Sequence, residues 1–320
     1  MIYEEFLEYV KAHVKNYLPE MYQSATVEIT KVIKNNDIHL DSLTITTDQE
    51  SMQGHVMIPA LYLNQYYQNY MDRGNLEVTM RTIALDYQQA LRQAPEFDPD
   101  LLTDYNQAKD YIIVALVNTA FNKERLQNLP HQDIGGMSAI YKIDVTNSPL
   151  RQGKDEYGAT VSVTYEMMEH FGVTQEELHQ TALRNSQRLY PFMLKGLMET
   201  MGYPGGQEQM YVLSNKSGCM GAAVMLYPGV MESVMDRLGE VYILPSSTHE
   251  VLLVPRQGME GMEEELRRMV REVNQVAVEP QEVLGNDIYT YNRDTKQIQV
   301  VEPQTAQVKL PFKQHKPRTL

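Results

Sequence analysis

The residues best suited to do chemistry in this chain lie within residues 210–255, which contain its only cysteine, Cys219, and a histidine, His249. Histidine has an ordinary pKa of about 6.5, so its imidazole is suited to act as a general base. An imidazole beside a thiol can also convert that thiol into a nucleophile. The pattern predicts a candidate site for a small-molecule or peptide hydrolase centred on His249. Its other members would be the orienting carboxylate Glu250 and the alternative nucleophiles Ser246, Ser247 and Cys219.

The same residues also have a structural interpretation, which the sequence favours. A histidine in a polar turn commonly bonds to backbone groups, and a single cysteine that enters an apolar strand behaves as a small hydrophobic residue. No complete catalytic set is recognisable in the sequence. The leading hypothesis is therefore a non-enzymatic intracellular binding or accessory protein, and the hydrolase centred on His249 is the alternative.

Two further segments are candidates for binding. Tyr62, Tyr66 and Tyr70 are spaced to share one helix face, where they could stack against a ligand or form part of a core. The segment SNKSG offers Asn215 and Lys216 in an expected loop, but it lacks the glycine spacing of a phosphate-binding P-loop.

Metal and cofactor sites are not predicted. A zincin needs two histidines four residues apart on a helix, and no second histidine follows His249 within reach. The segment EMMEH contains Glu166, Glu169 and His170 without a partner set, and one cysteine cannot build a structural zinc site. The expectation is no metal and no cofactor.

The composition limits the partners. The net charge of −14 opposes non-specific binding of nucleic acid, which depends on basic side chains that displace counterions from phosphates. No apolar run approaches the roughly 18–20 residues that cross a bilayer. The single cysteine and the acidic N-terminus indicate a cytoplasmic location. With 20 Met, 21 Tyr and no Trp, the composition favours a protein partner. Nucleic acid is expected only at the basic tail, through Lys309, Lys313, Lys316 and Arg318.

The hydrophobic periodicity predicts an α+β fold. Residues 1–130 are expected to form a helix-rich domain with a β-hairpin, residues 131–303 a mixed, largely antiparallel sheet with flanking helices, and residues 304–320 a mobile tail. Residues 210–255 are expected to run strand, turn, strand, helix, strand, turn, strand. Other helices are expected over residues 3–17, 61–74, 76–93, 100–127, 174–201 and 260–276, strands over 138–146 and 158–168, and hairpins over 25–47 and 287–301.

The chain also resembles a known family of uncharacterised proteins, of the domain-of-unknown-function kind, from Gram-positive gut bacteria and often encoded among mobile-element genes. The resemblance implies a cytoplasmic bacterial protein linked to integrative elements. The pattern of the family that the resemblance implies does not require cysteine at position 219, which argues against a thiol mechanism common to the family. The motifs that carry it are YLNQYYQNY (62–70), YVLSNKSG (211–218), GAAVMLYPGV (221–230), YILPSSTHEVLLVP (242–255) and VNQVAVEPQEVLGNDIYTYNRDT (273–295).

Overall fold

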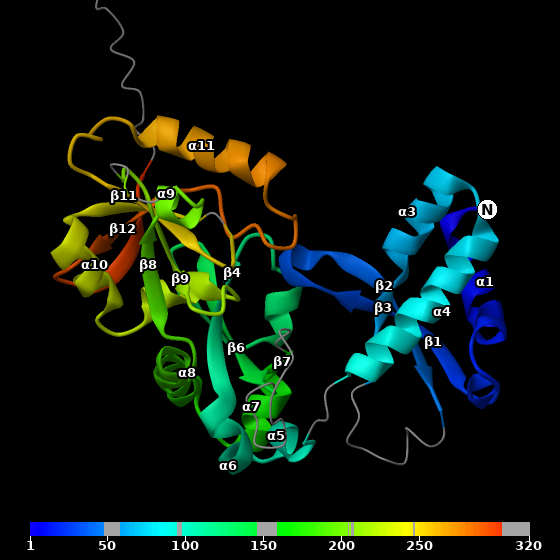
Figure 1. The fold of residues 1–320 in the computed structure, drawn as a ribbon. Coiled ribbons are helices and arrows are strands. Elements are labelled where there is room, and N and C mark those ends of the chain that lie inside the picture. Colours follow the sequence, from blue (N-terminus) through cyan, green and yellow to red (C-terminus); the bar gives the residue numbers. More distant parts are fainter. Residues whose placement is uncertain are drawn as a thin grey trace, which may run out of the picture.

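The computed structural model divides into two modules, each with its own hydrophobic core. One core contains side chains from Phe6 to Tyr87, and the largest of the others contains side chains from Leu101 to Tyr289. We name residues 1–94 the N-terminal module and residues 98–302 the C-terminal module (Figure 1). The structure describes residues 1–47, 58–94, 98–145, 159–203, 205, 208–245 and 247–302.

The N-terminal module packs helices against a three-stranded antiparallel sheet. Phe6 and Val10 from the first helix meet Leu43, Ile45 and Tyr87 in its core. The helices and the hairpin predicted for residues 3–93 are confirmed, with a final 3-10 turn after the first helix. The elements are α1 (Tyr3–His13), β1 (Thr26–Ile33), β2 (His39–Thr46), β3 (Leu61–Tyr62), α3 (Leu63–Arg73) and α4 (Leu76–Gln93).

The long helix predicted for residues 100–127 is wrong. Two short helices, α5 (Asp100–Thr103) and α6 (Tyr105–Ala108), lead into strand β4 (Ile112–Asn118). Every residue of β4 is buried, so its continuous apolar run gives neither a helical nor a strand periodicity. The branched side chains Ile112, Ile113, Val114 and Val117 favour the strand.

The C-terminal module contains two antiparallel sheets. In the first, β4 pairs with β6 (Met137–Asp144), which also pairs with β5 (His131–Ile134) and β7 (Thr160–Ser162). The predicted boundary near residue 130 falls between strands of this sheet. The second sheet has the order β13-β12-β10-β11-β9-β8. Its strands are β8 (Phe192–Gly196), β9 (Tyr211–Asn215), β10 (Val241–Leu244), β11 (Val251–Pro255), β12 (Tyr289–Asn292) and β13 (Gln297–Val300).

Helices cover these sheets, and the fold is α+β as predicted. Helix α8 packs on β4, where the Ser186 hydroxyl accepts a hydrogen bond from Val114 N at 2.9 Å. Helix α11 covers the second sheet through Leu266 and Val270 (Figure 1). The helices are α7 (Tyr165–Phe171), α8 (Gln175–Leu189), α9 (Leu197–Thr200), α10 (Val230–Leu238) and α11 (Glu263–Val276).

Three predicted boundaries in this module need correction. The strand expected over 158–168 ends at Ser162, because the Thr164 side chain accepts from Met167 N and begins α7. The helix expected to reach residue 201 ends at Leu189, just before Pro191, which cannot donate a helical hydrogen bond. The strand expected after Cys219 is instead a short 3-10 helix, Gly221–Leu226.

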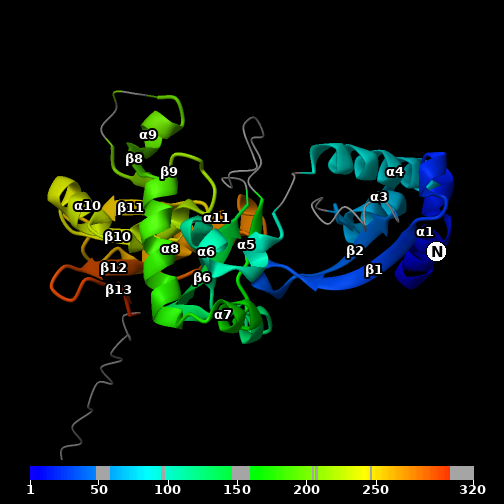
Figure 2. The same cartoon turned by 90° about the horizontal axis from the view of Figure 1, so that it is seen from below.

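The tip of the β1–β2 hairpin joins the two modules (Figures 1 and 2). Asn36 Nδ2 donates to the carbonyl oxygens of Pro280 and Val283 at 2.7 and 2.9 Å. The Asn36 backbone N–H and side-chain oxygen also bond to the buried amide of Asn122, at 2.9 and 3.0 Å. The backbone of Asn36 has a φ of 61°, which asparagine tolerates better than most residues.

Two other tip residues complete the contact. Asn35 Nδ2 donates to Gln281 O at 2.7 Å, and the Asp37 carboxylate accepts from the backbone N–H groups of Glu124 and Arg125 at 2.8 and 3.0 Å. The tip therefore holds residues 280–283 and 122–125 with directional hydrogen bonds. We call residues 35–37 the docking tip.

Candidate functional site

The loop after β9 presents Cys219 and is organised by Asn215. The side chain of Asn215 is buried, and its Oδ1 accepts from Ser217 N and Ser217 Oγ at 3.0 and 2.8 Å. Its Nδ2 donates to Cys219 O at 2.8 Å. Asn215, a predicted binding residue, therefore fixes the loop, while Lys216 and Cys219 are exposed.

The chain then turns sharply and packs against the turn before β11, which contains His249. Met220 adopts a left-handed conformation with φ 52°, which is strained for a non-glycine residue. A Cβ on the next residue, Gly221, would lie 2.1 Å from Ser214 Oγ and 2.3 Å from His249 O. Only glycine permits this approach, which brings the Cys219 loop and the His249 turn into backbone contact.

The polar turn before β11 is fixed by Ser247. This serine is buried, and its Oγ accepts from His249 N at 3.0 Å. The Ser247 N–H donates to Glu250 O at 3.3 Å. The Ser247 hydroxyl is thus engaged in holding the turn. Ser246, the other predicted hydroxyl nucleophile, lies outside the described residues.

The imidazole of His249 contacts three groups. Its Nε2 lies 3.3 Å from Glu282 Oε1, and its Nδ1 accepts from Met220 N at 3.2 Å. A hydrogen bond with the side chain of Cys219 raises the pKa of His249 to about 8, and Glu282 adds to this rise against the effect of burial. In this geometry Nδ1 is the acceptor and Nε2 faces the carboxylate, and the thiol and carboxylate neighbours favour a protonated imidazole.

The carboxylate that faces the His249 ring is that of Glu282, in the place predicted for Glu250. Glu282 follows α11 in the chain. A backbone hydrogen bond fixes its position, because Thr248 N donates to Glu282 O at 2.8 Å. No local spacing connects residues 249 and 282, so the sequence contained no signal for this pair. The structure brings Cys219, His249 and Glu282 together.

A basic pocket adjoins this site and shares Glu282 with it. The pocket has a volume of about 660 Å³ and lies where the β1–β2 hairpin meets β6, β7 and residues 281–282. Glu282 is the one acidic residue that lines it among the described residues. Four cationic residues line it: Lys31, Lys34, Arg125 and Lys142.

Two of these cations are partly buried and are held by neutral groups. Lys142 Nζ donates to Thr160 Oγ1 at 3.1 Å, and Arg125 donates to Ser162 Oγ at 3.3 Å and Asn35 Oδ1 at 3.4 Å. The pKa of Lys142 is lowered to about 8, mainly by burial and also by the neighbouring charges of Arg125 and Lys34, while Cys219 acts in the opposite direction. Burial also lowers the pKa of Arg125, against the attraction of Asp37. In the described part of the chain neither residue forms an ion pair.

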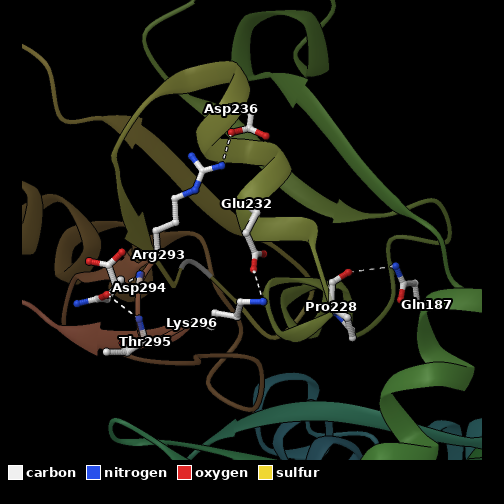
Figure 3. A network of polar contacts seen from close by, with 9 residues as sticks. Gln187, Pro228, Glu232, Asp236, Arg293, Asp294, Thr295 and Lys296 are labelled. Carbon is white, nitrogen blue, oxygen red and sulfur yellow. Dashed lines mark hydrogen bonds and ion pairs between the residues drawn. The ribbon is translucent and has the colours of Figure 1, made fainter.

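A second polar pocket, of about 530 Å³, lies between α10 and the β12–β13 hairpin. Two ion pairs connect the same two elements, and of their four residues Glu232 and Lys296 line the pocket (Figure 3). Arg293 lies 2.6 Å from Asp236, and Lys296 lies 3.9 Å from Glu232. We call these four residues the paired network. Its contacts connect α10 to the hairpin, which indicates a structural role.

The predicted tyrosine row lies in the N-terminal module. Tyr66 and Tyr70 pack against the core of that module, and Tyr66 donates to Asp86 at 2.7 Å. The Tyr70 ring stacks on Phe6 with a centroid distance of 6.0 Å. Tyr62 lies under the ammonium group of Lys34, 4.5 Å from the ring centroid. The basic tail, with Lys309, Lys313, Lys316 and Arg318, lies outside the described residues.

The described part of the chain offers neither a metal cluster nor a membrane-spanning helix. Within these ranges no group of three or more His, Cys, Asp or Glu side chains is arranged to hold a metal ion. Among the helices that the structure describes, none has both the length and the apolar character needed to cross a membrane.

Comparison with known proteins identifies the family. Residues 3–293 match the model of a family of unknown function, DUF5688. Since the match spans nearly the whole chain, the protein belongs to this family. No curated protein and no solved structure matches the chain. The predicted membership of a family of unknown function is thus confirmed, while the Gram-positive source and the mobile-element context stay predictions.

Proposed function

We propose that this protein is a thiol-dependent hydrolase that cleaves an acyl bond of a small molecule or peptide. Cys219 is the nucleophile, His249 the general base and Glu282 the residue that orients the imidazole. One observation carries the proposal: the His249 ring lies between a thiol and a carboxylate, with Nε2 facing Glu282 at 3.3 Å. A nucleophile, a base and an orienting third group are the minimum set for this chemistry.

The reaction follows from the hydrogen bonds of His249. Nδ1 gives up its hydrogen bond from Met220 N and takes the proton of the Cys219 thiol, and the sulfur attacks the carbonyl carbon of the substrate. The carbon–leaving-group bond then breaks, and the imidazolium returns the proton to the leaving group. Water, deprotonated by His249, hydrolyses the resulting thioester and regenerates the thiol. Glu282 stabilises the imidazolium in both halves of the reaction.

The rigidity of the Cys219 loop supports this role. The Asn215 side chain holds Cys219 O, and the strained turn at Met220 directs its backbone N–H at His249. Backbone strain that the surrounding structure maintains is frequent at active sites. The fixed loop reduces the reorganisation needed to bring the thiol to the imidazole.

The first test is the alkylation rate of Cys219 with iodoacetamide between about pH 6 and pH 9. Because the chain has a single cysteine, total thiol loss reports this residue alone. We expect His249→Ala and Glu282→Gln to slow alkylation at neutral pH by roughly fivefold or more, because the thiolate loses its imidazolium partner. Glu250→Gln is the matched control and should leave the rate unchanged. Equal rates in all four proteins would overturn the proposal.

The second test measures whether Cys219 forms an acyl-enzyme and releases the acyl group again. After incubation with 4-nitrophenyl acetate, intact mass spectrometry should detect an acetyl group on Cys219 that disappears with time. His249→Ala should slow both its formation and its loss. Turnover that survives in Cys219→Ala but not in His249→Ala would assign the attack to water activated by His249 and refute the thiol step.

The alternative function is binding without catalysis, in which His249 and Glu282 hold the turn in place. The Met- and Tyr-rich composition supports this alternative. It predicts a Cys219 that alkylates like a free thiol and no acetyl-enzyme. A role as an accessory protein of mobile elements stays a prediction from the sequence resemblance, and inspection of the genes that flank the coding sequence would test it.

A further inference from the structure

We infer that the basic pocket binds the anionic end of the substrate, a phosphate or carboxylate group of a small molecule. The identity of the ligand as a substrate rests on the proposed function, whereas the binding of an anion does not. The inference starts from charge. The chain carries a net charge of −14, yet this pocket collects four cationic side chains around one carboxylate.

The partial burial of two cations is the second observation. Removing a charge from water is unfavourable unless another charge compensates it. Lys142 and Arg125 face hydroxyl and amide oxygens from Thr160, Ser162 and Asn35, which orient the cations without neutralising them. An anionic ligand would supply the missing charge, and the hydroxyl and amide groups would keep both cations in position to receive it.

The location of the pocket links the ligand to the proposed reaction. Glu282 lines the pocket and also orients His249, so the two sites share a wall. On the other side of Glu282, the His249 ring meets the side chain of Cys219. An anion held by Lys142 and Arg125 would therefore leave the rest of the substrate beside Cys219.

The two sides of the pocket come from different modules. Lys31 and Lys34 belong to the β1–β2 hairpin, and Arg125 and Lys142 belong to the C-terminal module. A volume of about 660 Å³ suits a small molecule, since ligand sites commonly span roughly 300–1,000 Å³. The geometry fits a small polyanion that contacts both modules.

Calorimetric titration of the full chain at low salt with pyrophosphate and with citrate tests the inference. We expect at least one of them to bind in a saturable manner. Tighter binding of pyrophosphate would indicate a phosphate group, and tighter binding of citrate a carboxylate group. Lys142→Met and Lys31→Met should each weaken binding by roughly tenfold or more, the usual size of a lost charge-assisted contact. The matched control Lys195→Met removes one charge from the exposed face of β8 and should leave the affinity unchanged.

Thermal unfolding of the same variants adds a readout that a purely structural lysine would not give. Lys142→Met removes a charge that burial disfavours, so the ligand-free protein should become more stable while it loses anion binding. The absence of saturable binding by either probe would overturn the inference. Equal weakening by Lys195→Met and Lys142→Met would also overturn it, because general charge screening would then explain the binding.

Repeating the titration on Cys219→Ala separates this inference from the proposed function. The anion should bind this variant as it binds the unchanged protein. Anion binding with an unreactive thiol would leave a binding protein without catalysis. A reactive thiol without anion binding would leave a hydrolase whose substrate is recognised elsewhere.

Discussion

The basic pocket and the paired network are two polar regions with different charge balance. In the paired network each cation has its own carboxylate, Arg293 with Asp236 and Lys296 with Glu232. In the basic pocket, Lys142 and Arg125 face neutral oxygens. The first arrangement is complete in the folded chain, whereas the second has charge left over. The difference indicates that uncompensated charge, and not volume, marks a polar pocket as a ligand site.

The difference between the two regions should disappear if the basic pocket is given a carboxylate of its own. Thr160→Glu would place a carboxylate where Lys142 now meets a hydroxyl, so anion binding should fall about 100-fold, or about 2.7 kcal/mol. Calorimetric titration with the better of the two probes measures it. Thr160→Gln removes the same hydroxyl without adding charge, and a loss as large in this control would contradict the electrostatic explanation.

The two regions also differ in how many modules build them. Asn36→Gly keeps the positive φ of the docking tip but removes three side-chain hydrogen bonds to the C-terminal module. At a net value of about 0.5–1.5 kcal/mol each, the loss of stability should be roughly 1.5–4.5 kcal/mol in urea unfolding. Anion binding should weaken as well, because Lys31 and Lys34 lose their fixed position.

A matched variant separates the contacts of the docking tip from its backbone conformation. Asn36→Ala loses the same side-chain bonds and should be less stable than Asn36→Gly by about 1 kcal/mol, because alanine is strained at a φ of 61°. A chain that tolerates Asn36→Gly without loss of stability or of anion binding would show that the tip does not hold the modules together.

The pH dependence of binding distinguishes the two regions further. The pKa of Lys142 is lowered to about 8, so the lysine is protonated below this pH and loses its charge above it. Binding of sulfate, whose own charge is constant in this range, should be steady up to about pH 8 and weaken about tenfold by about pH 9. The same titration on Cys219→Ser is the control for the nearby thiol, and it should show the same dependence on pH. Binding that does not change between about pH 7 and pH 9 would contradict the role of Lys142.

The smallest effect is expected in the paired network. Arg293→Met breaks an ion pair whose side chains are about half exposed, so the free energy of unfolding should change by roughly 0–1 kcal/mol. Anion binding in the basic pocket should stay the same. A loss of sulfate affinity in this variant would mean that the two regions are coupled.

Local signals made part of the fold predictable from the sequence. The helix Leu76–Gln93 has its predicted bounds, and α8 begins at the predicted Thr174 and Glu177 capping box. The hairpin around Asn35–Asp37 followed from alternation and turn residues. Strand β4 was missed because both of its faces are buried, which removes the alternation that distinguishes a strand from a helix.

The candidate site was predictable only where its members are close in sequence. Cys219 and His249 were found because one short stretch contains both residues. Glu282 was missed because its contact with His249 depends on how α11 and the following chain return to the sheet. The four cations of the basic pocket are scattered from residue 31 to residue 142, and no periodicity connects them.

The docking tip has a consequence for how this protein can vary during evolution. Its side chains bond mainly to main-chain groups of the C-terminal module, namely the carbonyl groups of Pro280, Gln281 and Val283 and the N–H groups of Glu124 and Arg125. Main-chain groups are present whatever the side chain, so most substitutions at the receiving positions preserve these bonds. The donor and acceptor side chains at 35–37 have no such freedom. Selection to keep the modules joined therefore acts mainly on one short turn.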